Sequence, residues 1–227
     1  MILNSKLKTF CLIFARGGSV RLKHKNIKIF NNKPLIYQSI DLAKKSKLFS
    51  KIFVSTDSKR ISIIAKKYGA DVIARPKKFA TSKVEEFLAW KHAVRYLESK
   101  KLKFDIFVSL PCTAPLREIS DVKNCLKKIK SKNQLVMTYY YGDLNNKLSI
   151  KKSSNKINYI LNNYTKNSKK VAHLTTVAYV TTPSYIKNYS NLLDGKILLV
   201  EVPKIRAVDI NDIVDFKFAE NLIYKKK

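Results

Sequence analysis

The sequence predicts an α/β fold: a doubly wound, mostly parallel sheet with helices on both faces. Two observations carry this prediction. Short apolar runs alternate with longer segments in which apolar residues recur at helical spacing, an order typical of right-handed βαβ units. The run at residues 105–110 is almost purely apolar, as expected for a strand covered on both faces. The 227 residues are enough for one such domain, and no linker divides them.

Each predicted strand of the first half is followed by a predicted helix. The strands are expected at residues 10–15, 51–55, 71–74 and 105–110. The helices are expected at residues 34–43, 58–69 and 84–97, and from Ser120 or Asp121 onward. Pro34 suits a first helical turn, Ser58 can cap the second helix, and Gly69 can end it.

The second half of the sequence is less regular. Strands are predicted at residues 134–140, 177–181 and 197–202, with a short helix at 183–189. Apolar residues at helical spacing mark a last helix: Phe216, Ala219, Leu222 and Ile223. Between these elements, residues 141–170 are rich in Asn, Lys and Ser and have few apolar anchors. We expect either an inserted hairpin or flap, or a long loop, in that segment.

The charge of the chain is strongly positive, with 46 Lys and Arg against 16 Asp and Glu and a net charge of +30. Such a balance is compatible with a protein that binds nucleic acid. However, the lysines are spread along the whole chain and no nucleic-acid motif accompanies them. We therefore favour a generally basic surface that steers an anionic substrate, without nucleic acid as a partner.

The cysteines and the N-terminus bear on the compartment. Cys11, Cys112 and Cys125 cannot all pair, and their spacing offers no zinc site. Buried thiols in a reducing compartment are the expected state. The apolar run that begins at Phe10 is too short for a signal peptide or a membrane span, so we expect a cytoplasmic protein without membrane insertion.

The first predicted strand ends in a glycine turn that carries cations. The turn and the cations after it are Ala15, Arg16, Gly17, Gly18, Ser19, Arg21, Lys23 and Lys25. Glycines let the backbone approach a ligand closely, and free N–H groups and cations hold phosphates. The turn lacks the Gly-Lys-Ser/Thr of a Walker loop. It predicts a phosphate site of another kind, and an ordinary basic turn is the alternative.

Three further polar segments each follow a predicted strand. They lie at residues 55–57, 75–76 and 111–117. In open α/β sheets the ligand binds beyond the carboxyl ends of the strands. These segments and the glycine turn therefore predict one site at that edge of the sheet. Asp57 is either an acidic contact in this site or part of a helix entry.

The strand ends together resemble those of the cytidylyltransferases that activate sialic acids and related ulosonic acids. The first strand of that family ends in Ala-Arg-x-Gly-Ser-Lys-x-x-Pro-x-Lys-Asn, which Ala15, Arg16, Gly18, Ser19, Lys25 and Asn26 match. Residues 54–57, 75–76, 110–117 and 208–215 resemble the later family motifs in the same order. The resemblance covers most of the chain. It implies a single Rossmann-like domain of the nucleotidyltransferase type over residues 1–227, with a small inserted segment at about 141–170 for dimerisation and sugar binding.

The resemblance implies a reaction as well. CMP passes from CTP to the anomeric hydroxyl of a sialic-acid-like ulosonic acid, pyrophosphate is released, and the CMP-sugar serves surface glycan synthesis. Catalytic roles are implied for Arg16, Lys25 and Asp209. The residues implied to bind CTP are Ala15, Arg16, Gly18, Ser19, Asn26, Arg75 and Ser82. A solvated surface position is the alternative for Lys25, and a salt bridge within a turn is the alternative for Arg75.

A metal site and sugar contacts follow from the same resemblance. Mg²⁺ is expected at Asp209 and Asn211, which project to the same side of an extended chain and offer oxygen ligands. A helix cap is the alternative role for Asp209. The residues expected to contact the sugar are Thr113, His173, Thr175, Thr176 and Tyr179. A lone histidine in a strand is more often structural.

Several positions depart from the family pattern. Val20 replaces a lysine, Lys23 a proline, Pro111 a glutamine and Asn211 an aspartate. The nucleotide half is therefore retained while the sugar half is altered, which favours a substrate other than N-acetylneuraminate. A Kdo-type or other sugar nucleotidyltransferase, a non-catalytic family member and a basic nucleic-acid-binding protein are the alternatives. Because the relatives are commonly dimers, a homodimer is expected.

Overall fold

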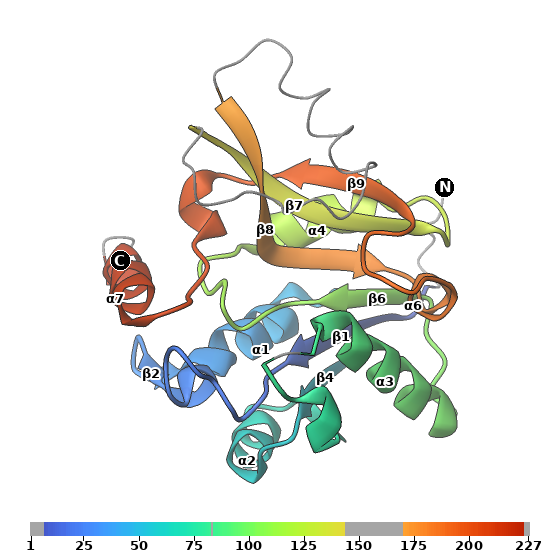
Figure 1. Ribbon diagram of the computed structural model, residues 1–227, viewed down its shortest axis with the longest axis horizontal. Coiled ribbons are helices and arrows are strands. Elements are labelled where there is room, and N and C mark those ends of the chain that lie inside the picture. The colour runs from blue at the N-terminus through green and yellow to red at the C-terminus, as the bar shows by residue number, and fades with distance from the viewer. Residues whose placement is uncertain (1–6, 83, 144–169, 225–227) are drawn as a thin grey trace.

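A seven-stranded sheet with the strand order β5-β4-β1-β6-β8-β7-β9 forms the middle of the structure (Figure 1). The computed structural model describes residues 7–82, 84–143 and 170–224. The strands of this sheet are β1 (Thr9–Phe14), β4 (Lys51–Thr56), β5 (Asp71–Ala74), β6 (Ile106–Ser109), β7 (Gln134–Asp143), β8 (Lys170–Thr181) and β9 (Lys196–Glu201). Strand β8 runs antiparallel to both of its neighbours, and the other neighbouring pairs are parallel. The predicted mostly parallel α/β fold is confirmed.

Six helices of the described chain pack around this sheet or at its edge. They are α1 (Leu35–Ser46), α2 (Lys59–Lys67), α3 (Glu86–Ser99), α4 (Ile119–Lys128), α6 (Pro183–Asn188) and α7 (Ile213–Tyr224). Short 3₁₀ turns lie at η1 (Lys25–Ile27), η2 (Lys77–Phe79) and η3 (Lys204–Ala207). None of the described helices is long and apolar enough to cross a membrane.

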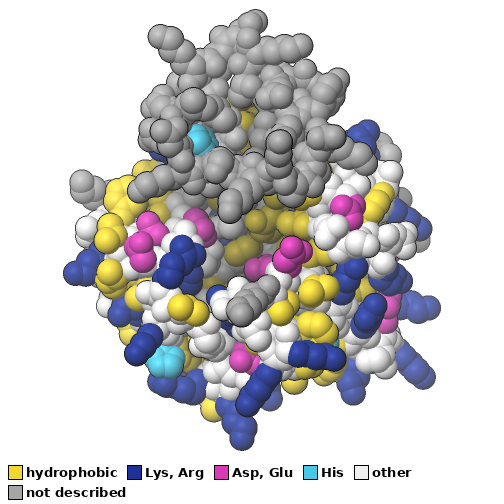
Figure 2. Space-filling view, viewed as in Figure 1, with side chains coloured by type: hydrophobic (Ala, Val, Ile, Leu, Met, Phe, Trp, Pro, Cys, Tyr) yellow, Lys and Arg dark blue, Asp and Glu magenta, His cyan; other side chains and the backbone are white. Residues whose placement is uncertain are grey.

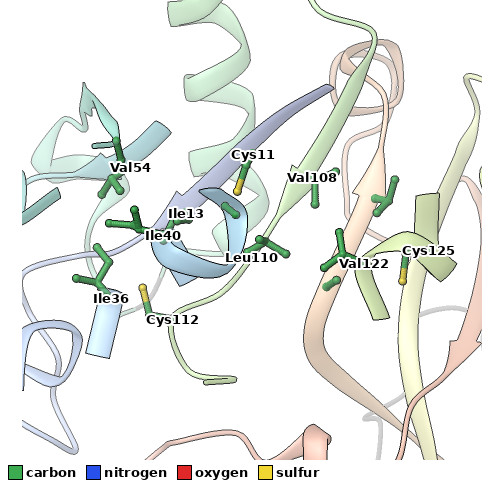
Figure 3. Close-up of a cluster of buried hydrophobic side chains, with 14 of the residues drawn as sticks. Cys11, Ile13, Ile36, Ile40, Val54, Val108, Leu110, Cys112, Val122 and Cys125 are labelled. Carbon is green, nitrogen blue, oxygen red and sulfur yellow. The ribbon is translucent and has the colours of Figure 1, made fainter. Parts of the chain in front are cut away.

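Strand β1 supplies side chains to both faces of the sheet. Because successive side chains of a strand alternate, Phe10, Leu12 and Phe14 belong to one buried cluster and Cys11 and Ile13 to another. The first cluster contains buried side chains of α3 and α6. The second contains side chains of α1, α2 and α4, several of which are drawn in Figure 3. The apolar residues of the predicted βαβ units are thus those that cover the sheet.

A small hairpin, absent from the sequence prediction, joins the first loop to α1. Strands β2 (Ile29–Phe30) and β3 (Lys33–Pro34) pair in antiparallel fashion across Asn31 and Asn32, which both take positive φ. Asparagine tolerates this backbone conformation, which two-residue hairpin turns need. Phe30 packs edge-on against Phe216 of α7 at 5.3 Å between ring centroids. This contact fixes the C-terminal helix beside the first loop.

The strands on either side of the predicted insertion are longer than expected. Their pairing runs from Val136↔Val180 to Asp143↔Lys170, so residues 141–143 and 170 are strand rather than insertion, and β8 begins at Lys170 instead of at residue 177. The strand residues missed by the prediction are largely polar or aromatic, such as Tyr141 and Thr175, so they do not show the apolar alternation on which the prediction depended. The remaining residues of the predicted insertion, 144–169, lie outside the described residues.

Helix α3 also differs from its prediction at its first turn. It begins at Glu86, two residues after Val84, and Leu88 is 41% exposed instead of facing the core. The residues that cover the sheet from this helix include Phe87, Trp90, Val94 and Leu97. The first residue of the helix, Glu86, lines a cavity, a role for which no sequence prediction was made.

Candidate functional site

Two adjoining cavities lie at the carboxyl ends of the parallel strands. The first, of about 540 Å³, is lined by the loop after β1, by the segments after β5 and β6, and by Asn211. The second, of about 680 Å³, lies between the start of α3, the end of β6, strand β8 and residues 191–194. Figure 2 shows a hollow in this face of the molecule, with acidic and apolar side chains at its edge. The site predicted at this edge of the sheet thus coincides with two real cavities.

The loop after β1 is fixed from beneath by an aspartate and an asparagine. The Gly17 N–H donates to Asp57 Oδ1 at 2.8 Å, and Asn26 Nδ2 donates to the Arg16 carbonyl at 3.0 Å. A Cβ on Gly17 would lie 3.0 Å from Ser58 Cβ, whereas a Cβ on Gly18 would meet nothing within 4 Å. Gly17 is therefore the glycine that the fold requires, although the motif drew attention to Gly18. Asp57 positions the loop.

Four cationic side chains line the first cavity: Arg16, Arg21, Lys25 and Arg75. Lys25 Nζ donates to the Ile210 carbonyl at 2.7 Å, and burial lowers the Lys25 pKa while the negative charge of Asp209 opposes this shift. Lys25 is therefore part of the site and not a solvated surface lysine. Ser19 and Ser82 line the same cavity, while Ala15 is fully buried beneath it.

Arg75 is only 7% exposed and is held by the end of β4. Its Nε donates to Ser55 Oγ at 3.2 Å and its Nη2 donates to the Ser55 carbonyl. The guanidinium lies 5.5 Å from the centroid of the Phe14 ring, and burial lowers its pKa. No salt bridge of Arg75 is present among the described residues. Its planar group is thus fixed at the cavity wall by neutral partners.

Asn211 borders both cavities, Asp209 lines the second, and the two side chains bond to each other. Asp209 Oδ1 accepts from Thr176 Oγ1 at 2.9 Å, and Oδ2 accepts from Asn211 Nδ2 at 3.0 Å. Asn211 Oδ1 in turn accepts from Arg21 Nη2 at 2.7 Å. The Ile210 N–H donates to the Thr113 carbonyl at 2.8 Å, which ties this segment to the loop after β6. The distant C-terminal segment thereby completes the site.

The second cavity has the opposite charge character. Its lining includes four carboxylates, Glu85, Glu86, Asp194 and Asp209, and no Lys or Arg among the residues that the structure describes. Its apolar wall comes from Phe87, Trp90, Tyr179, Leu192 and Leu193. The first cavity therefore offers positive charge, and the second offers hydrogen-bond acceptors and aromatic surface.

The residues predicted to touch a sugar divide into two groups. Thr113 borders both cavities, and Thr176 and Tyr179 line the second. His173 instead stacks on Tyr140 with 5.0 Å between ring centroids, and the buried Thr175 Oγ1 lies 2.6 Å from Thr138 Oγ1. The structure does not bring these two side chains to either cavity.

The loop after β6 is held by a buried arginine. Arg117 Nη1 donates to Ser39 Oγ at 2.7 Å, and Nη2 donates to the Pro111 carbonyl. Burial lowers the Arg117 pKa to about 10. Because Pro111 lines the second cavity, Arg117 positions one wall of the site from below.

Comparison with known proteins agrees with this geometry. Residues 10–194 match the family described as cytidylyltransferase, which is more than half of the chain. The chain belongs to the cytidylyltransferase family. It is 27% identical to the N-acylneuraminate cytidylyltransferase of Escherichia coli O18:K1:H7 over 227 residues, which cover 97% of this chain and 53% of that protein. It is 38% identical to a pseudaminic acid cytidylyltransferase of Campylobacter jejuni over 127 residues, which cover 56% of this chain and 53% of that one.

The chain spans about half the length of the curated relatives it matches. Among solved structures it is similar to CMP:2-keto-3-deoxy-manno-octonic acid synthetase complexed with CTP, with a TM-score of 0.70 and 15% identity over 97% of this chain and all of that one. It is also similar to a nucleotidyl transferase from Methanothermobacter, with a TM-score of 0.68 and 12% identity over 97% and 99%. Because the sequence identities to these two structures are so low, the similarity establishes a shared fold and nothing more.

Cytidylyltransferases of this fold generally use a divalent metal, and one carboxylate of this site fits such an ion. Asp209 faces the cavities, while the Asn211 oxygen is already engaged by Arg21. Within the described ranges, no group of three or more His, Cys, Asp or Glu side chains could hold a metal. A magnesium-type ion often takes only one or two protein carboxylates and completes its shell with phosphates and water. Asp209 satisfies that minimum.

No sequence motif marks several residues of the two cavities. Glu86, Trp90 and the pair Leu192-Leu193 line the second cavity but belong to no motif. Leu192 and Leu193 sit in a loop after α6, and Glu86 stands at the first turn of a helix, where a carboxylate is ordinary. Only the folded chain shows that these residues meet.

Proposed function

We propose that this protein transfers CMP from CTP to the anomeric hydroxyl of a sialic-acid-like nonulosonic acid and releases pyrophosphate. The observation that supports the proposal is the pair of adjoining cavities. One is lined by four cations and suits a triphosphate, and the other is lined by carboxylates and aromatic side chains and suits the hydroxyl groups and ring faces of a sugar. The acceptor's own carboxylate would face the cations of the first cavity. The attacked α-phosphorus and the attacking oxygen would meet where the cavities join.

Within this proposal, each cation stabilises negative charge on the triphosphate. Arg16 and Lys25 face the phosphates, with Ser19 and the N–H groups of the loop as further donors. The fixed guanidinium of Arg75 offers donors to the cytosine ring. Asn26 and Ser82 complete the nucleotide cavity, Gly18 lets the loop approach the phosphates, and Thr113 lies between nucleotide and acceptor.

We propose Mg²⁺ as the divalent ion, held by the Asp209 carboxylate. Bound there, it would supply positive charge to the phosphate oxygens. Thr176 and Asn211 orient the carboxylate through the hydrogen bonds described above. Arg21, held by Asn211, adds a cation near the position where the family has the lysine that Val20 replaces.

The acceptor class and the assembly complete the proposal. The relatives' names support a nonulosonic acid such as a neuraminic, pseudaminic or legionaminic acid. All three cysteines are free and buried, which supports a reducing compartment such as the cytoplasm.

We propose a homodimer, to be tested by light scattering coupled to size-exclusion chromatography; a monomeric mass at assay concentration would refute it.

Pyrophosphate release tests the function directly. The purified chain is incubated with Mg²⁺, one of the four nucleoside triphosphates, and one acceptor from a panel of nonulosonic acids that includes Kdo. We expect release with CTP and at least one nine-carbon acid, and a CMP-sugar identified by mass spectrometry. Release with Kdo alone would assign a Kdo-type enzyme. No release with any acceptor, together with tight and salt-dependent DNA binding, would refute the proposal.

A further inference from the structure

Five described residues border both cavities: Phe14, Asn26, Glu86, Thr113 and Asn211. Glu86 is the only one of them whose side chain titrates in the pH range of an enzyme. A carboxylate beside a cavity that holds a triphosphate repels the anion and weakens its binding. Its place at the junction is therefore a feature to be explained.

The Glu86 carboxylate is held by the helix on which it stands. Trp90, one turn further along α3, donates from Nε1 to Glu86 Oε1 at 3.0 Å. Trp90 is 2% exposed and packs against Phe107 and Tyr179 at 4.9 and 5.5 Å between ring centroids. The indole is thus rigid, and it holds one carboxylate oxygen of a side chain that lines both cavities. A group fixed in this way is suited to accept a proton in a defined direction.

We propose that Glu86 is the general base that accepts the proton of the attacking anomeric hydroxyl. This inference rests on the proposed function. The acceptor oxygen forms a bond to the α-phosphorus of CTP, the bond from that phosphorus to the bridging oxygen of the β-phosphate breaks, and pyrophosphate leaves. The hydroxyl proton passes to the Glu86 carboxylate and then to solvent, since the side chain is exposed to the cavities.

The other carboxylates near the site are less available for this step. Both oxygens of Asp209 accept hydrogen bonds, from Thr176 and from Asn211, and Asp57 accepts from the loop at Gly17. Glu85 lines the acceptor cavity but does not border the nucleotide cavity. Glu86 alone combines a position at the junction with an orienting donor.

The surroundings of Glu86 make it a stronger base. Desolvation of the carboxylate by the surrounding protein raises its pKa, against the opposing effects of the Trp90 hydrogen bond and of the charge on Arg75. The other charged groups that act on it are Asp209, which raises its pKa, and Arg16, which lowers it. Tyr179 and Cys112 also lie near, but burial raises the pKa of each, so both are neutral at physiological pH. Its raised pKa gives the carboxylate more proton affinity than an ordinary glutamate has.

The test compares Glu86→Gln with wild type across pH. The glutamine keeps an oxygen that can accept from Trp90, so the fold is expected to remain, as checked by circular dichroism and thermal unfolding. We expect kcat to fall by about 100-fold or more at neutral pH, with CTP affinity by calorimetry changed by less than about threefold. Because CTP itself titrates, the decisive quantity is the ratio of wild-type to variant rates. That ratio should shrink as pH falls, since protonated Glu86 can no longer act as a base.

Glu98→Gln is the matched control. Glu98 stands near the other end of α3 and forms an exposed ion pair with Lys187 at 2.7 Å. Its variant is expected to keep wild-type rates at every pH. Glu86→Asp, which withdraws the carboxylate by one methylene, should retain a pH-dependent rate below that of wild type.

Two results would overturn the inference while leaving the proposed function intact. One is a Glu86→Gln variant with a wild-type kcat. The other is a loss confined to the KM of the acceptor, with a rate ratio that does not vary with pH, which would make Glu86 an acceptor-binding residue only. A wild-type protein that releases no pyrophosphate with any acceptor would overturn the proposed function, and the inference with it.

Discussion

Arg21 Nη2 donates a hydrogen bond to Asn211 Oδ1 at 2.7 Å, which joins the loop after β1 to the segment before α7. Asn211 also donates from Nδ2 to Asp209, so a single amide connects a cation and a carboxylate. An aspartate at this position would pair with Arg21 but would lose the donor to Asp209. The neutral amide therefore holds Arg21 and orients Asp209 at the same time, which a second carboxylate could not do. Asp209 is left as the carboxylate that can hold a metal.

Asn211→Asp is expected to strengthen the metal dependence of the site. The variant adds a second hard oxygen ligand next to Asp209, and Mg²⁺ commonly takes one or two carboxylates. We expect the Mg²⁺ concentration for half-maximal pyrophosphate release to fall by about threefold or more. Asn188→Asp, an equal charge change on the exposed surface of α6, is the control and should leave it unchanged. An unchanged or higher requirement in Asn211→Asp would contradict the assignment of the metal to this segment.

Arg16→Ala and Asp209→Ala should each reduce turnover sharply without unfolding the protein. Each removes a charged partner of the proposed substrate complex, and a hydrogen bond to a charged group contributes about 1.5–3 kcal/mol, or about 10- to 150-fold in rate or affinity. Steady-state kinetics and thermal unfolding would be measured together. If both variants keep wild-type kcat/KM, the site assignment is wrong.

Much of the fold was predictable because burial on a parallel sheet leaves a clear pattern. The strand at Asp71–Ala74 has the predicted bounds, and the helix at Leu35–Ser46 was displaced by only one residue at its start. Part of the first cavity was predictable for a related reason. Arg16, Ser19, Lys25 and Asn26 come from one continuous stretch, so they are near one another in the chain, although contacts with Asp57 and Ile210 fix the loop that carries them.

The acceptor side was harder to predict because its geometry depends on an irregularity in β8. The pairing of β7 and β8 passes from Thr138↔Thr175 to Met137↔Tyr179, so the register skips residues 176–178 of β8. A bulge of this kind redirects side chains and breaks the alternation that a regular strand would have. Thr176 and Tyr179 therefore line the same cavity while Thr175 does not. No local sequence signal marks the bulge.

Gly17→Ala and Gly18→Ala should differ in stability. The new Cβ at residue 17 would press on Ser58, which caps α2, whereas the new Cβ at residue 18 would enter open space. We expect Gly17→Ala to lower the free energy of unfolding by about 1–2 kcal/mol, as crowding of a packed site does. Gly18→Ala should stay within about 0.5 kcal/mol of wild type. Urea unfolding decides between these outcomes, and equal losses in the two variants would refute the distinction.

Thr175→Val and Thr176→Val form a second matched pair, because the two hydroxyls face different partners. The Thr175 hydroxyl bonds within the sheet to Thr138, so its loss should lower the free energy of unfolding by about 1 kcal/mol and leave the acceptor KM unchanged. The Thr176 hydroxyl orients Asp209, so its loss should reduce kcat and raise the Mg²⁺ requirement while stability changes little. Chemical denaturation and pyrophosphate-release kinetics on both variants measure the two effects. A raised acceptor KM in Thr175→Val would restore Thr175 as a sugar contact and show that β8 has a different register when the substrate is bound.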